Sequence, residues 1–223
     1  MRLGVIVAFD QEVRLLDLTG TPKRIGGCRI SELTIGNTEV VLALCGIGKA
    51  NAAACTQLLI SVCGVDAVLN IGLAGNASSL PIGGAVLVTS ATYHDVIPVD
   101  FVSEDYPNVS VFDADPYLVG VAEQVLTELA IPFVKGPLAT GDQFISDTSV
   151  KNDIIARTGC KAVEMEGGAI AHIARKNDIP FCLVKVISDS AEDEAHDEFV
   201  DTLSIADYLD TSTGFIRRFA AIL

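Results

Sequence analysis

The sequence predicts an α/β fold in a single domain over residues 1–223, with a mixed, largely parallel central sheet. Short β-like runs alternate with helix-like segments along most of the chain, an order typical of parallel sheets. Two β-like runs near the N-terminus are separated only by Gly36-Asn37, which predicts an antiparallel hairpin and therefore a mixed sheet. Half of the 223 residues are hydrophobic, which is enough for one sizeable core, and no repeat or linker divides the chain.

The first half of the chain is expected to contain several strands and one helix. Apolar or alternating runs predict strands over residues 3–9, 27–35, 39–44, 67–71 and 85–90. An alanine-rich segment with leucines at helical spacing predicts a helix over residues 50–62. The small residues from Gly72 to Asn76 are expected to form a loop, and an irregular region is expected from Tyr93 to about Pro116.

The second half is expected to be richer in helices. Periodic segments predict helices over residues 117–129, 148–158, 167–177 and 204–221. Apolar runs predict strands over residues 132–138 and 181–188. The acidic residues from Asp189 to Asp201 are expected to form a linker before the final helix.

Charge and composition exclude several classes of partner. The formal net charge of −14 repels phosphate backbones and anionic membrane surfaces, so neither nucleic acid nor a membrane is an expected partner. No signal-peptide pattern opens the sequence, and we expect a cytoplasmic protein. The six cysteines form no C-x-x-C pair and are expected to be reduced thiols. The three histidines have no ligand spacing, which predicts no metal site.

The motif Gly46-Ile47-Gly48-Lys49 is neither a P-loop nor a dinucleotide fingerprint. A P-loop needs four residues between its glycines and a Ser or Thr after the Lys, whereas Ala50 follows here. The dinucleotide fingerprint needs a third glycine where Asn51 stands. The motif remains a strand end and a helix N-terminus, and this turn either faces a polar ligand or packs the helix on the sheet.

The segment Ala162 to His172 places Glu164 and Glu166 around Met165, directly before a glycine pair and a helix. Acids at a helix start either complement the helix dipole or belong to a ligand site. The carboxyl ends of strands in an α/β sheet share one rim, so Glu12 and Asp189 are expected across one crevice from each other, near this segment. Paired carboxylates without a metal, a nucleophile pair or a phosphate loop predict acid/base cleavage of a glycosidic bond.

Seven motifs, in their order and spacing, resemble those of the 5′-methylthioadenosine/S-adenosylhomocysteine nucleosidases of the purine nucleoside phosphorylase superfamily. They are the opening strand with Glu12, Gly46-Ile47-Gly48-Lys49, Asn70-Ile71-Gly72-Leu73-Ala74-Gly75, Tyr93-His94-Asp95, Gly141-Asp142-Gln143-Phe144-Ile145, Val163-Glu164-Met165-Glu166 and Ile187-Ser188-Asp189. The resemblance implies a three-layer αβα sandwich, usually a homodimer, with no metal or organic cofactor. It also implies hydrolysis of the N-glycosidic bond of 5′-thio-substituted adenosines, which releases adenine and a 5-thioribose product.

Carried over by position, the resemblance assigns the chemistry to two carboxyl groups. Glu12 would activate the attacking water, and Asp189 would donate a proton to N7 of the departing adenine. Glu166 would hold the ribose hydroxyls, with Met165 against the sugar. An Asp normally titrates near ~3.9, so the crevice must raise the pKa of Asp189 or let it share a proton with the base.

The resemblance also implies a base pocket. Phe144 would stack on the adenine, and the backbone of Ile145 would read its polar edge. Ala74 and Val163 would line the same pocket.

A separate subsite for the 5′ substituent is implied as well. Ile47 and Phe199 would border it, with Phe101 contributed by the partner subunit. The segment Asp95 to Phe101 departs from the usual pattern of the family, which affects this subsite.

Two further departures keep alternatives open. Leu73 stands where the family usually has Ser, and Lys185 where it usually has Arg. Lys keeps the charge but lacks the planar fork of Arg. The alternatives are a phosphorylase on the same fold, for which Lys49 and Lys185 are the basic residues expected near the rim, and a nucleoside-binding protein with weak catalysis.

Overall fold

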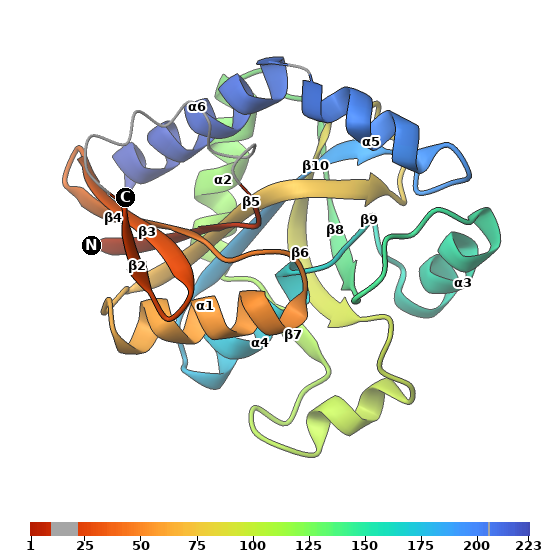
Figure 1. The fold of residues 1–223 in the computed structure, drawn as a ribbon, viewed down its shortest axis with the longest axis horizontal. Helices are drawn as coiled ribbons and strands as arrows, with labels where there is room; N and C mark the ends of the chain where they lie inside the picture. The colour runs from red at the N-terminus through yellow and green to blue at the C-terminus, as the bar shows by residue number, and fades with distance from the viewer. Residues whose placement is uncertain (10–21, 205) are drawn as a thin grey trace.

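The computed structural model describes residues 1–9, 22–204 and 206–223, with side chains for all of these except 202–204 and 206–211. A central sheet runs through the molecule and helices pack on both of its faces (Figure 1). None of the helices in these ranges is long and apolar enough to cross a membrane.

The predicted strands and helices occur in the predicted order, and the structure adds three short strands at Lys23–Ile25, Val111–Asp113 and Ala162–Glu164 and two helices at Val99–Ser103 and Ala195–Ser204. The strands are β1 (Arg2–Val7), β2 (Lys23–Ile25), β3 (Cys28–Ile35), β4 (Thr38–Leu44), β5 (Ala67–Asn76), β6 (Ala85–Tyr93), β7 (Val111–Asp113), β8 (Phe133–Thr140), β9 (Ala162–Glu164) and β10 (Phe181–Asp189). The helices are α1 (Lys49–Ser61), α2 (Pro116–Glu128), α3 (Thr148–Thr158), α4 (Gly167–Lys176), α5 (Ala195–Ser204), α6 (Ala206–Ile222) and the 3₁₀ helix η2 (Val99–Ser103).

The sheet is mixed, as predicted, but part of it closes on itself. The strand order is β10-β6-β8-β9-β5-β1-β4-β3-β2, and β10 also pairs with β5, so that β5, β10, β6, β8 and β9 form a ring. Among the described strands, five pairings are parallel and five antiparallel, a more even mixture than the alternation of strands and helices predicts. The α/β class and the mixed central sheet are confirmed, whereas the three-layer sandwich is not, because this part of the sheet is a closed barrel.

The predicted loop from Gly72 to Asn76 is wrong, because β5 continues through it to Asn76. These residues pair with β10 on one side, and Gly75 also pairs with Val163 of β9 on the other. The small residues serve close packing: a Cβ at Gly75 would lie 2.9 Å from Ala191 Cβ and 3.0 Å from Asp189 Oδ1. The glycine is therefore required where the ring of strands closes, and it does not mark a turn.

Side chains alternate between two hydrophobic layers. One face of the sheet, with Val41, Val68 and Val86, packs against α1 and α4. The opposite face, with Leu42 and Leu69 among others, packs against α2 and α6. Both faces are covered, which explains why the central strands read as nearly continuous apolar runs.

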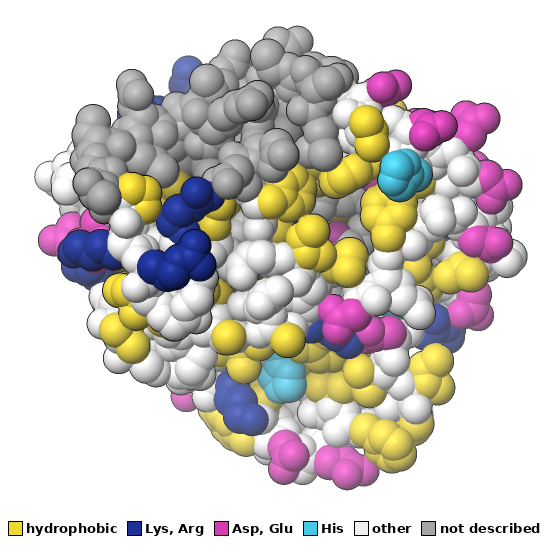
Figure 2. Space-filling view, in the orientation of Figure 1, with side chains coloured by type: hydrophobic (Ala, Val, Ile, Leu, Met, Phe, Trp, Pro, Cys, Tyr) yellow, Lys and Arg dark blue, Asp and Glu magenta, His cyan; other side chains and the backbone are white. Residues whose placement is uncertain are grey.

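The predicted acidic linker is also corrected. It contains the start of α5 at Ala195, and Asp197 and Glu198 lie in the first turn, where carboxylates complement the helix dipole. A residue that precedes the helix also contacts it: Ser190 N donates to Glu198 Oε2 at 2.7 Å. In Figure 2, acidic side chains gather along the right-hand edge of the molecule, over α5 and α3.

Candidate active site

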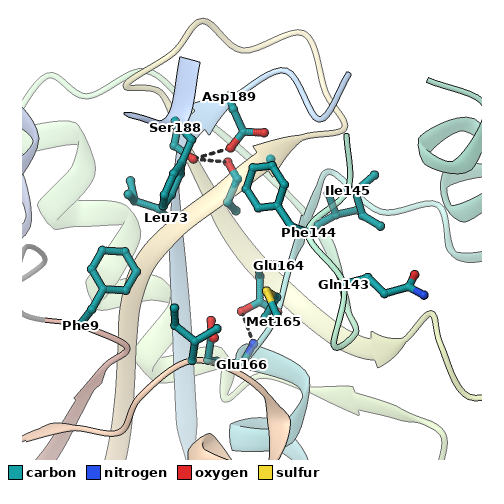
Figure 3. A pocket seen from close by; sticks show the side chains of 15 residues that line it. Phe9, Leu73, Gln143, Phe144, Ile145, Glu164, Met165, Glu166, Ser188 and Asp189 are labelled. Carbon is teal, nitrogen blue, oxygen red and sulfur yellow. Dashed lines mark hydrogen bonds between the residues drawn. The ribbon is translucent and has the colours of Figure 1, made fainter. Parts of the chain in front are cut away.

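A cavity of about 260 Å³ opens where β5 and β10 end beside β9 and the start of α4. Hydrophobic side chains surround a hollow on this face in Figure 2, and Figure 3 shows the side chains from close by. The described residues that line the cavity are Phe9, Ile47, Leu73, Ala74, Gly75, Gln143, Phe144, Ile145, Val163, Glu164, Met165, Glu166, Ser188, Asp189 and Phe199.

Nine of the eleven predicted site residues line this cavity. They are Ile47, Ala74, Phe144, Ile145, Val163, Met165, Glu166, Asp189 and Phe199. Phe101 does not: it lies on η2 and is 60% exposed. Glu12 lies outside the described residues.

Asp189 is the last residue of β10, and its carboxyl group is nearly inaccessible to solvent. Ser188 Oγ donates to its Oδ2 at 2.7 Å, and Ala191 N donates to its Oδ1 at 2.9 Å. Burial raises the pKa of Asp189 above its ordinary value, although these two hydrogen bonds oppose the shift. Because α5 begins only at Ala195, Asp189 is not the N-cap of a helix.

Glu164, the last residue of β9, is buried beneath the start of α4. Its Oε2 accepts from Glu166 N at 2.9 Å and from Gly167 N at 2.7 Å, and it lies 2.7 Å from Lys185 Nζ. Its Oε1 accepts from Thr140 Oγ1. Burial alone would raise the pKa of Glu164, but the Lys185 ammonium and these hydrogen bonds hold it below its ordinary value.

Two carboxylates of the protein occupy the N-terminus of α1. Gly48 N donates to Glu166 Oε1 at 2.8 Å, and Lys49 N donates to Asp142 Oδ1 at 2.8 Å. Lys49 Nζ contacts Asp95 Oδ2 at 2.6 Å. The turn at Gly46 to Gly48 therefore brings its backbone N–H groups and its lysine to carboxylates of the chain itself.

One wall of the cavity is apolar and aromatic. Leu73 and Val186 form a small buried cluster with Phe9 and Phe199 packed against it. Phe199 meets Phe9 edge-on with ring centroids 6.4 Å apart, and it meets Phe144 edge-on at 5.7 Å. In Figure 3, Phe9 and Leu73 lie on one side of the cavity, while Phe144, Ile145 and Gln143 lie on the other.

Sequence reasoning gave no role to several lining residues. Phe9 follows the first strand, and its position at a strand end shortly before Glu12 is the signal that could have identified it. Ser188 lies beside the predicted Asp189, and its hydrogen bond to that carboxyl group depends on the bulge at the end of β10. Gln143 belongs to the same motif as Phe144 and Ile145, but the resemblance assigned it no role.

The arrangement separates two carboxyl groups by their environments. Asp189 is kept in its acid form to a higher pH than usual, while Glu164 is kept ionised. Such a divergence is what distinguishes a proton donor from a charged, structural carboxylate in one site. In the described part of the chain, no group of three or more His, Cys, Asp or Glu side chains could hold a metal ion.

A family model described as the phosphorylase superfamily matches residues 2–222. The chain belongs to this superfamily. Solved structures of nucleosidases of the kind that the sequence motifs resemble are similar to this structure over its whole length.

Three similar structures illustrate the likeness. A 5′-methylthioadenosine/S-adenosylhomocysteine nucleosidase from Neisseria meningitidis, in complex with methylthio-immucillin-A, has a TM-score of 0.90 and 29% identity, with 100% of this chain and 99% of that chain covered. An S-adenosylhomocysteine nucleosidase from Streptococcus pyogenes, in complex with 5-methylthiotubericidin, has a TM-score of 0.91 and 29% identity, with 100% and 97% covered. A futalosine hydrolase of Helicobacter pylori has a TM-score of 0.89 and 27% identity, with 100% and 98% covered.

Within this superfamily, the two departures noted in the sequence lie at the cavity or directly beneath it. Leu73 presents an apolar side chain in the aromatic wall, and Lys185 is completely buried against Glu164. They therefore belong to the site, one as its lining and the other as its support.

Proposed function

We propose that the chain hydrolyses the N-glycosidic bond of 5′-thio-substituted adenosines, such as 5′-methylthioadenosine and S-adenosylhomocysteine. The observation that carries the proposal is the buried Asp189 carboxyl group, with its raised pKa, in a cavity that also contains Glu166. A buried carboxyl group that keeps its proton to a higher pH than usual is suited to protonating a leaving base. The likeness to nucleosidases along the full length of the chain supports the same reaction.

In the proposed reaction, the C1′–N9 bond breaks and its electron pair leaves with the adenine. Asp189 gives its proton to N7, so that adenine departs as a neutral base. The sugar develops oxocarbenium character, which ionised carboxylates beside it favour. Water then adds to C1′, and Glu12, which lies outside the described residues, takes the proton of that water.

We assign sugar binding to Glu166 and Met165, which lie together at the start of α4 (Figure 3). The carboxylate of Glu166 would accept hydrogen bonds from the ribose hydroxyls, and Met165 would pack against the ring. Glu166 is well placed for this role because Gly48 N already fixes one of its oxygens.

Adenine is assigned to the part of the cavity with Phe144, Ile145, Ala74 and Val163. These four residues line the same cavity as Asp189. An aromatic ring at Phe144 and small or apolar neighbours suit a flat heterocycle, and the Ile145 backbone supplies polar groups.

The 5′ substituent is assigned to the aromatic wall, with Ile47 and Phe199 as predicted and Phe9 as an addition. Phe101 would reach this subsite only from a partner subunit, and we propose a cytoplasmic homodimer of single-domain subunits. Exposed apolar side chains on the segment around η2 suit such an interface: Ile97, Phe101, Tyr106, Val109 and Val111.

A phosphorylase needs cations around the phosphate, and the two lysines considered for that role have carboxylate partners. Lys49 contacts Asp95, and Lys185 contacts Glu164. This observation favours water over phosphate as the nucleophile.

The test is adenine release from 5′-methylthioadenosine, S-adenosylhomocysteine and adenosine, each with and without phosphate. Fast release from a thio-nucleoside without phosphate is the expected result. Dependence on phosphate would move the chain to the phosphorylases. Tight binding without release would instead indicate a nucleoside-binding protein.

A further inference from the structure

We propose that Lys185 and Glu164 form a buried ion pair that positions Glu166 for its contact with the sugar, so that Lys185 determines recognition of the ribose hydroxyls without touching the substrate. This inference rests on the proposed function, in which Glu166 holds those hydroxyls. It assigns both residues as positioning residues.

Both members of the ion pair are buried. The side chains of Lys185 and Glu164 are 1% and 3% exposed, and Nζ lies 2.7 Å from Oε2. A charge removed from water at this depth is tolerated only with a partner of opposite sign and further hydrogen bonds. The Lys185 ammonium therefore stabilises the ionised form of Glu164 at this depth.

Glu164 also accepts hydrogen bonds from the start of α4. The same Oε2 that contacts Lys185 accepts from the backbone N–H groups of Glu166 and Gly167. Its Oε1 accepts from Thr140 Oγ1, which in turn accepts from Gly168 N at 2.7 Å. Side-chain oxygens thus hold three consecutive N–H groups, and these fix the backbone from which the Glu166 side chain projects.

The backbone fixed in this way carries the Glu166 side chain, which holds the ribose hydroxyls in the proposed function. Glu166 is the N-cap of α4, and its own side chain makes no capping hydrogen bond. Its Oε1 instead accepts a hydrogen bond from Gly48 N, at the start of α1. Glu164 and Thr140 accept from the N–H groups at the start of α4, and the Lys185 ammonium favours the ionised form of Glu164.

The experiment compares two substrates in three variants. The substrates are 5′-methylthioadenosine and its 2′,3′-dideoxy counterpart, and the variants are Lys185→Met, Lys185→Arg and Glu166→Gln. Misplacing a positioned group by about 1 Å can reduce a rate about 100-fold. We expect Lys185→Met to lower kcat/KM for the hydroxyl-bearing substrate by up to about that factor, and to leave kcat/KM for the dideoxy substrate nearly unchanged.

Lys185→Arg retains the charge and should preserve most of the preference for the hydroxyl-bearing substrate. Glu166→Gln should abolish the preference, as Lys185→Met does. An equal loss on both substrates in Lys185→Met, or an unchanged preference, would overturn the inference.

Removing one partner of a buried ion pair destabilises a protein, so Lys185→Met could fail to fold. The double variant Glu164→Gln/Lys185→Met removes both charges and serves in its place. It should fold and should also have lost the hydroxyl preference, and an intact preference in this variant would refute the positioning role.

The proposed function and this inference fail in different ways. If the unaltered protein releases no adenine, the proposed function fails, and the same preference is then measured as a ratio of dissociation constants by calorimetry. If the unaltered protein is active but the preference survives without the ion pair, only the inference fails.

Discussion

Gly48 N, at the start of α1, donates a hydrogen bond of 2.8 Å to Oε1 of Glu166, at the start of α4. This bond joins two helix N-termini through one carboxylate, and Asp142 takes the next N–H group of α1 in the same way. A helix N-terminus is a ready site for an anion, and here protein carboxylates fill it. A phosphate ion would have to displace these carboxylates or be repelled by their negative charge.

The first prediction follows from this arrangement. The rate of adenine release should be the same in phosphate and in a phosphate-free buffer, because Glu166 and Asp142 already occupy the N-terminus of α1. Mass spectrometry of the sugar product formed in ¹⁸O-labelled water with phosphate present should find a free, labelled sugar. Formation of a sugar 1-phosphate would contradict the prediction.

The second prediction concerns the proton of Asp189. Asp189→Asn preserves the shape of the side chain but removes the acid, and loss of a general acid typically reduces a rate about 100- to 10,000-fold. Adenine release should fall by a factor in that range. Ser90→Ala, a change on β6 away from the cavity lining, is the matched control and should retain activity.

The same substitution has a predicted effect on stability, with the opposite sign. Because the folded pKa of Asp189 is raised, the folded protein binds more protons than the unfolded chain at pH values between the unfolded and the folded pKa. The stabilising contribution of Asp189 is therefore complete below the unfolded pKa and is lost as the pH rises through the folded pKa. At neutral pH, Asp189→Asn should unfold at an equal or higher temperature than the unaltered protein, and a calorimetric Tm that falls would oppose this explanation.

Much of the fold could be predicted because local signals agreed with the tertiary structure. Gly36-Asn37 lies between β3 and β4 in an antiparallel hairpin, as predicted. The predicted helix over residues 148–158 coincides with α3, which Asp147 caps by accepting from the N–H groups of Ser149 and Val150. In both cases neighbouring residues alone determine the turn or the cap.

The errors arise where partners distant in sequence decide the conformation. Gly72 to Asn76 has the composition of a loop, but pairing with β10 and β9 makes it a strand. The ion pair between Lys185 and Glu164 joins β10 to β9, and no periodicity in the sequence predicts it. Motif positions placed nine predicted side chains around the cavity, whereas the hydrogen bonds beneath the cavity required the structure.

The third prediction tests the aromatic wall through Leu73→Ser. Leu73 is 7% exposed and packs with Phe9 and Phe199, so the change removes buried apolar volume and introduces a hydroxyl. We expect a loss of about 2–5 kcal/mol of stability, as for other truncations of buried leucines. The preference for 5′-methylthioadenosine over adenosine should also fall, by about 10-fold or more, because an apolar wall discriminates by such factors.

The control for this prediction is Leu126→Ala. Leu126 is also buried but lies on α2, in the hydrophobic layer away from the cavity. It should reduce the stability by a similar amount without altering the ratio of kcat/KM values for the two nucleosides. A preference that shifts equally in both variants would show that Leu73 acts through stability alone.

The last prediction concerns the glycine pair at the start of α4. A Cβ at Gly168 would lie 2.8 Å from Thr140 Cβ and 2.9 Å from Thr140 Oγ1, so the helix can approach β8 only without a side chain there. Gly168→Ala should therefore push Thr140 away from Glu164 and lower the stability by about 1–3 kcal/mol, the usual effect of overpacking.

Gly120→Ala in α2 is the matched control, because nothing lies within 4 Å of its Cβ position, and it should raise the stability by about 0.5–1 kcal/mol. Thermal unfolding of the two variants measures both effects, and adenine release from Gly168→Ala should fall with the loss of the Thr140 contact. Equal stabilisation by both alanines would mean that the space between α4 and β8 is wider than these distances indicate.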